Sequence, residues 1–250
     1  MSVAMVTGNA APAVQAQGMD ETGVKAAAGA QIVPTPKEMS TDGQELTMTE
    51  SVNIEGADAV DKDAVRELKE FLTDKGIEVN ETADDQDTTI ILGEADDEIA
   101  ALDKAKERLG MEDADALGEE GYVMAVDSED SNAGTIAIEG KSGDGTFYGV
   151  QTLKQLAEES DGNVVVADAV IKDEPTMSVR GTIEGFYGNP WSHADRLSQI
   201  EFYGDMKMNT YIYAPKDDPY HREQWREPYP DSEMERMQEL IDTAKENKVD

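Results

Sequence analysis

The clearest fold signal in the chain is RGTIEGFYGNPWSHADRL, residues 180–197, where a strand pattern leads through a loop into a helix pattern. The same order recurs from residue 208, where MNTYIYA precedes a long loop and a second helix pattern. The predicted elements are strands at 177–184 and 209–214 and helices at 193–206 and 232–248. Because helical crossovers connect parallel strands, these two units predict the opening of an α/β domain.

The loops that follow the two predicted strands are suited to binding a ligand. GFYGNPW, residues 185–191, sets aromatic rings among glycines, which let the backbone approach a ligand while the rings lie against the apolar faces of a sugar. The second loop places Lys216 beside two carboxylates. In an α/β barrel the reactive groups lie at the C-terminal ends of the strands, where both loops fall.

A purely structural role for these loops stays open. Arg222, Arg226, Asp217 and Asp218 are able to form an ion-pair network that fixes a long loop, and Trp191 is able to serve as a core residue. In that case the loop lysine pairs with a neighbouring aspartate at the surface, where an ion pair contributes about 0 to 1 kcal/mol.

The region before residue 177 has the pattern of a separate α+β domain. Apolar and polar residues alternate over 44–55, which predicts strand pairing, and spacings of three and four predict a helix that Gly76 ends. Further strands are expected at 88–92, 122–126 and 135–139, with one helix at 99–109 and another marked by Val150, Leu153 and Leu156. Ten of the 14 aromatic residues lie after residue 176, so we place the domain boundary there.

The chain is strongly acidic, with 55 Asp and Glu against 21 Lys and Arg and a net charge of -34. Residues 1–176 carry a net charge of -28 (12 basic, 40 acidic) and residues 177–250 carry -6 (9 basic, 15 acidic). Such a field repels phosphate backbones and anionic membranes, so no nucleic-acid partner is expected. A dense carboxylate surface also suits a protein that works in high salt, which we hold as a hypothesis.

The N-terminal segment, residues 1–31, is expected to be a leader and linker. It is rich in small residues, and the stretch that ends at Ala16 resembles the tail and cleavage site of a secretory signal, although the basic n-region is missing. An Ala- and Gly-rich leader without targeting value is the alternative. The sequence shows no apolar run of about 18 residues. We therefore expect a secreted or cell-surface protein without a transmembrane segment.

Other motifs do not predict a cofactor or a metal site. Cysteine is absent, and the two histidines, His193 and His221, lack metal-ligand spacing. The glycines from Gly143 are spaced G-x-G-x-x-x-G, one residue longer than the dinucleotide fingerprint, so a helix-entry turn in which glycine relieves backbone strain is expected. Acidic clusters lack calcium-loop spacing and are interpreted as surface charge; their members are Asp84, Asp85, Asp87, Asp127 and Asp130.

The motifs that begin at Arg180 and Met208 closely resemble the start of the catalytic domain in glycoside hydrolase family 84. This family includes bacterial exo-acting β-N-acetylglucosaminidases, proteins labelled hyaluronidase, and nucleocytoplasmic O-GlcNAcases. The region from about Ile32 to Asp173, with GDGTFYGVQTLKQL, resembles the small domain that precedes the barrel in secreted bacterial members. Asn189 departs from the family, where Arg or Thr is usual.

The resemblance implies an α+β domain at 32–176 followed by the first two β/α units of a (β/α)8 TIM barrel at 177–250. By the family pattern, Gly185 approaches the sugar through its backbone, Tyr187 lines the pocket, and Lys216 contacts the sugar hydroxyls. The implied partners are glycans or glycoproteins that carry N-acetylglucosamine.

The implied reaction is hydrolysis of terminal β-linked N-acetylglucosamine with retention, in which the 2-acetamido oxygen of the substrate is the nucleophile. The family's paired catalytic aspartates lie at the end of the fourth barrel strand, so no catalytic residue is expected within this chain. Asp217 and Asp218 belong to the second-strand motif. We expect an N-terminal fragment that is inactive alone; the alternative is a non-catalytic carbohydrate-binding or degenerate protein.

Overall fold

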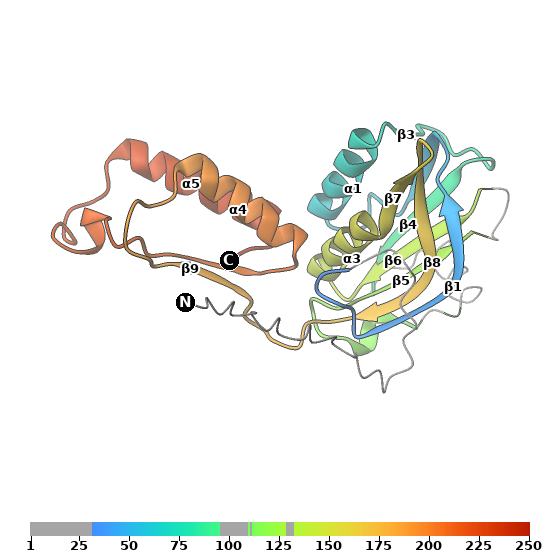
Figure 1. The fold of residues 1–250 in the computed structure, drawn as a ribbon, viewed down its shortest axis with the longest axis horizontal. Helices are drawn as coiled ribbons and strands as arrows, with labels where there is room; N and C mark the ends of the chain where they lie inside the picture. The colour runs from blue at the N-terminus through green and yellow to red at the C-terminus, as the bar shows by residue number, and fades with distance from the viewer. Residues whose placement is uncertain (1–31, 96–109, 111, 129–132) are drawn as a thin grey trace, which may run out of the picture.

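The structure is a computed structural model, and it describes residues 32–95, 110, 112–128 and 133–250 (Figure 1). The leader expected at 1–31, the helix expected at 99–109 and Asp130 lie outside the described residues. The described residues form one large sheet and one two-stranded sheet.

The large sheet has eight strands, seven of them in the order β1-β8-β5-β6-β4-β2-β3. β6, β4, β2 and β3 are parallel, whereas the pairs on the other side, from β6 through β5 and β8 to β1, are antiparallel, and β7 pairs with β8. The strands are β1 Glu38–Thr47, β2 Ser51–Glu55, β3 Glu78–Val79, β4 Thr88–Glu94, β5 Tyr122–Asp127, β6 Thr135–Gly140, β7 Ala157–Ser160 and β8 Asn163–Asp173.

Two helices, α1 Lys62–Asp74 and α3 Gly143–Leu156, cover one face of this sheet side by side (Figure 1). Asp61 caps α1 by accepting from the amides of Asp63 and Ala64, and the apolar stripe of α1 is buried against the sheet. A short 3-10 helix, Ala114–Ala116, precedes β5. Apart from residues 44–55, the predicted helices and strands of this region are confirmed where the structure describes them.

The glycines of α3 allow close packing and do not relieve backbone strain, so that part of the prediction is wrong. A Cβ atom at Gly145 would lie 2.1 Å from the carbonyl oxygen of Gly121, and a Cβ at Gly149 would lie 2.4 Å from a methyl group of Ile138. The left-handed backbone that favours glycine is absent at both positions. The helix therefore lies against β5 and β6 at a distance that only glycine permits.

The strand pairing predicted over 44–55 is divided between two strands, since β1 pairs with β8 and β2 pairs with β4. The amide of Met48 still bonds to Val164 of β8, whereas the amide of Thr49 already bonds to Thr88 of β4. Adjacent residues of the chain thus bond to β8 and to β4, which are separated by β5 and β6 in the strand order. At this end of the sheet, β8 and β4 therefore lie close to each other. Polar–apolar alternation continues through the break and therefore gives no signal of it.

The second sheet pairs β9 Gly181–Glu184 with β10 Thr210–Tyr213 in parallel, as predicted. α4 His193–Asp205 and α5 Asp231–Glu246 pack beside each other against these strands (Figure 1), and a 3-10 helix, Pro219–His221, lies in the second loop. Asp250 continues the pattern along β10, because its amide bonds to Asn209 and its carbonyl accepts from Tyr211. The described residues form a mixed α/β fold and contain no closed barrel.

The strand predicted from residue 177 begins four residues later, and Arg180, directly before it, contacts the first sheet's domain. Glu120 accepts from both terminal guanidinium nitrogens of Arg180, at 2.6 and 3.1 Å, and from the amide of the Asn209 side chain at 3.1 Å. Lys207 donates to Tyr122 at 2.9 Å. One carboxylate therefore holds the residues that come directly before β9 and β10. None of the described helices has the length and apolarity to cross a membrane.

Candidate functional site

The three predicted sugar-binding residues follow the C-terminal ends of adjacent strands. Glu184, the last residue of β9, pairs with Tyr213, the last residue of β10, so both loops leave the same edge of the sheet. Gly185 and Tyr187 lie in the first loop and Lys216 in the second. The structure thus places the three at one end of the two strands.

Their exposure suits contact with a ligand. The Tyr187 side chain is 82% exposed, whereas Gly185 and Lys216 are half-buried. Gly188, with φ of +112°, adopts a backbone conformation that other residues rarely take and turns the first loop. Among the residues that the structure describes, no ion pair joins Lys216 to Asp217 or to Asp218, whose carboxylate accepts from tyrosines instead.

Glu184 is a buried carboxylate at the base of the first loop, and sequence analysis did not select it. Its exposed fraction is 0%, and it accepts two bonds from Arg196, from Nε at 2.7 Å and from Nη2 at 2.8 Å. It also accepts from the amide of Trp191 at 3.2 Å and from the hydroxyl of Tyr211. Burial alone raises the pKa of Glu184, but the bonds from Arg196 and Tyr211 outweigh it and hold the pKa below its ordinary value.

Asp218 has the same role in the second loop. It is buried and accepts from the hydroxyls of Tyr213 and Tyr229, both at 2.9 Å, and from the amide of Tyr220 at 2.8 Å. Burial acts to raise the pKa of Asp218, but the bonds from these tyrosines lower it overall. Asp218 therefore stays ionised and serves as an acceptor that folds the loop.

Arg196 lies between the two carboxylates. Its guanidinium group bonds to Glu184 and also lies over the Tyr213 ring, 4.9 Å from the ring centroid. Since the Tyr213 hydroxyl donates to Asp218, a chain of contacts runs from the first loop to the second. The sequence carries one signal of this network that the sequence analysis did not use. A glutamate ends a predicted strand, and an arginine follows 12 residues later in the next predicted helix.

The structural alternative holds only in part, because Asp218 fixes the second loop through tyrosines and not through the expected arginines. Neither Arg222 nor Arg226 forms an ion pair within the described residues; Arg226 instead lies over the ring of Trp225 at 4.3 Å. Trp191 is half-buried and packs beside Phe186 with ring centroids 5.5 Å apart, so it belongs to the loop and not to the core.

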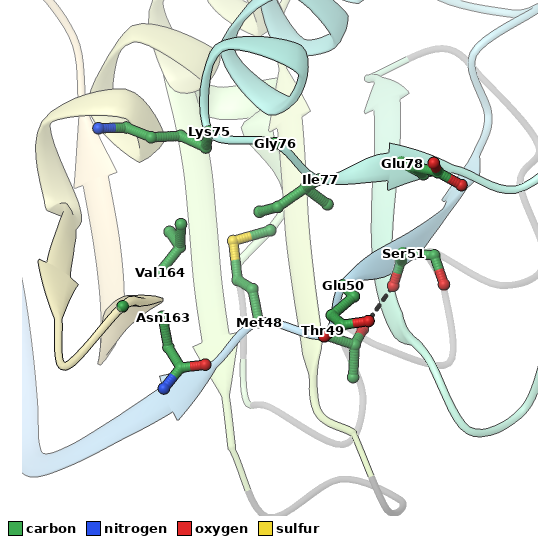
Figure 2. Close-up of a pocket in the computed structure, with 11 residues that line it drawn as sticks. Met48, Thr49, Glu50, Ser51, Lys75, Gly76, Ile77, Glu78, Asn163 and Val164 are labelled. Atoms are coloured by element: carbon green, nitrogen blue, oxygen red, sulfur yellow. Dashed lines mark hydrogen bonds between the residues drawn. The ribbon is translucent and has the colours of Figure 1, made fainter.

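Other cavities lie away from the predicted residues. Figure 2 shows one of about 470 Å³ where the turn before β2, the end of α1 and the turn before β8 come together, lined by Met48, Thr49, Lys75 and Asn163 among others. The ammonium of Lys75 is paired with Glu159 at 2.7 Å. Within the described part of the chain, no three acidic or histidine side chains are grouped to hold a metal ion. Asp87, one of the acidic residues interpreted as surface charge, accepts hydrogen bonds from the side chains of Ser51 and Asn80.

Two families match the chain. Residues 29–174 match the family described as Glycosyl hydrolase family 20, domain 2, and residues 180–250 match the family described as beta-N-acetylglucosaminidase. The structure CpGH84B is 45% identical with a TM-score of 0.75 over 88% of this chain. The chain belongs to the GH84-like glycoside hydrolases.

The GH84-like chain is similar to further proteins in sequence or in fold. Protein O-GlcNAcase of Rattus norvegicus is 43% identical over 70 residues, which is 28% of this chain. A GH20 exo beta-N-acetylglucosaminidase from Vibrio harveyi, 18% identical with a TM-score of 0.63 over 87% of this chain and 35% of that one, shares the fold. The GH84-like chain spans 8% of the length of the rat protein and 36% of CpGH84B.

Proposed function

We propose that this chain supplies part of the sugar site of a β-N-acetylglucosaminidase. The proposed reaction removes terminal β-linked N-acetylglucosamine from glycans or glycoproteins, with the substrate's own acetamido oxygen as the nucleophile. The observation that carries the proposal is the arrangement of the two loops. They leave one edge of a parallel sheet within the segment that matches the beta-N-acetylglucosaminidase family.

The chemistry of each predicted residue suits contact with a sugar. The backbone at Gly185 lacks a side chain that would keep a sugar ring away, and the exposed ring of Tyr187 offers an apolar face with a polar tip. Lys216 offers three donors, and a charged donor to a sugar hydroxyl is worth roughly 1.5 to 3 kcal/mol.

The general acid and base are proposed to come from another part of a TIM barrel. β9 and β10 would be its first two strands, with residues 32–176 as the preceding domain. Asp217 and Asp218 do not provide the acid. Asp218 is buried with three donors and a lowered pKa, so it does not hold a proton that it could transfer.

The test is a chimera in which residues 32–250 replace the matching segment of CpGH84B. We expect it to hydrolyse an aryl 2-acetamido-2-deoxy-β-glucoside and to leave the corresponding β-glucoside intact. Lys216→Ala should lower kcat/KM at least about tenfold, whereas Lys245→Ala, an exposed lysine on α5, should leave it unchanged. A folded chimera without activity, or a Lys216→Ala variant within about twofold of its parent, would contradict the proposal.

A further inference from the structure

We propose that Arg196 is a positioning residue that couples the two loops of the sugar site, so that a change in one loop is felt in the other. The purpose assigned to this coupling rests on the proposed function. The coupling itself is a property of the described residues and is measurable without sugar.

The first step of the argument is the link from Arg196 to the loop that carries Gly185 and Tyr187. Both oxygens of Glu184 accept from Arg196, and one of them also accepts from the amide of Trp191 at the far end of that loop. The beginning and the end of the loop are therefore held by one carboxylate. The Arg196 side chain is 12% exposed, so water competes little for these bonds.

The second step is the link to the loop that carries Lys216. The same guanidinium group lies over the ring of Tyr213, whose hydroxyl donates to Asp218. Asp218 in turn holds the amide of Tyr220 and the hydroxyl of Tyr229, which lie further along the same loop.

Only a planar guanidinium group makes both links at once. It bonds in parallel to two carboxylate oxygens and stacks on an aromatic ring, whereas an ammonium group is a compact point charge. Tyr211 also donates to Glu184, but it lies within β10, two residues before the strand ends, and so joins strand to strand. Arg196→Lys should therefore keep the charge and lose the coupling.

The two tryptophans of the chain provide the readout. In a Trp225→Phe background, Trp191 reports on the first loop alone. Asp218→Asn then perturbs the second loop, since an amide cannot accept at both of its polar atoms. We expect this change to shift Trp191 emission to longer wavelength and to increase its quenching by acrylamide. The matched control is Asp217→Asn, an exposed neighbour, which should change neither property.

The coupling is isolated by repeating the measurement without the link. In an Arg196→Lys background, and separately in a Tyr213→Phe background that removes only the hydroxyl, Asp218→Asn should have no additional effect on Trp191. Arg236→Lys, an exposed arginine on α5, should preserve the effect.

Three results would overturn the inference: no response of Trp191 to Asp218→Asn in the parent, an undiminished response in both uncoupled backgrounds, or parent Trp191 emission equal to that in denaturant. An inactive chimera together with a Trp191 response would count against the proposed function and leave the coupling intact.

Discussion

Replacing Lys207 by Met should change how stability depends on pH. Lys207 is 5% exposed, and its ammonium lies 2.9 Å from the Tyr122 hydroxyl and 3.7 Å from a carboxylate oxygen of Asp173. Burial lowers the pKa of Lys207 from 10.5 to about 8, although the negative charge of Asp173 acts in the opposite direction.

The direction and size of the effect follow from this pKa. Between about pH 8 and pH 10.5 the unfolded chain holds a proton on this amine that the folded chain does not, so Lys207 contributes stability that rises with pH. Below about pH 8 both states are charged and the burial penalty is constant, roughly 3 kcal/mol from a pKa lowered by about 2.5. Going from about pH 7.5 to about pH 10 recovers about 2 kcal/mol of this penalty.

The assay is urea unfolding of the parent and of Lys207→Met at those two pH values. The free energy of unfolding of the variant, minus that of the parent, should fall by about 2 kcal/mol as the pH rises. Taking this difference cancels the titration of residues common to both proteins. Lys245→Met, at an exposed lysine, should give a difference that does not depend on pH. An equally flat difference for Lys207→Met would refute the reasoning.

Three further predictions concern activity and packing. The purified 250-residue chain should not turn over the aryl 2-acetamido-glucoside, since general acid–base catalysis supplies roughly 10²- to 10⁴-fold and Asp218 is unsuited to it; turnover by rigorously purified chain would disprove this. In thermal melts, Gly145→Ala should lower the free energy of unfolding by about 1 to 3 kcal/mol, because the added methyl group would collide with the backbone directly before β5. Gly118→Ala should cost less, because the nearest atom there is a carboxylate oxygen at 3.4 Å. Ser192→Ala removes the capping box of α4 and should cost about 1 kcal/mol; a loss no larger than that of Ser198→Ala, at an exposed position within α4, would argue against the cap.

Local patterns in the sequence predicted most of the elements. The helix ended by Gly76 and the helix that begins after Ser192 were both found, because periodicity and capping depend on neighbouring residues. The parallel pairing of β9 and β10 followed from the helix between them. Gly185, Tyr187 and Lys216 fall at one sheet edge, as their places after the strands predicted.

What the sequence did not predict depends on partners far along the chain. Arg180 continues a strand pattern, yet its side chain bonds across to Glu120, 60 residues earlier, and the strand starts only after it. Glu184 has the appearance of an exposed strand-end acid, and its burial follows from the later positions of Arg196 and Tyr211. Periodicity describes which side of an element is apolar and does not identify which charged groups meet.

The contacts of Glu120 bear on how such chains can be recombined. In the sequence, a change of composition near residue 176 suggests a natural place to exchange one module for another. Glu120, however, lies on the early side of that point, while Arg180 and Asn209, which it holds at the start of two adjacent strands, lie on the late side. A crossover at residue 176 would inherit the carboxylate from one parent and its two donors from the other. Recombinants that keep these three residues from the same parent should retain the relative alignment of the two strands, and with it the common edge from which both loops emerge.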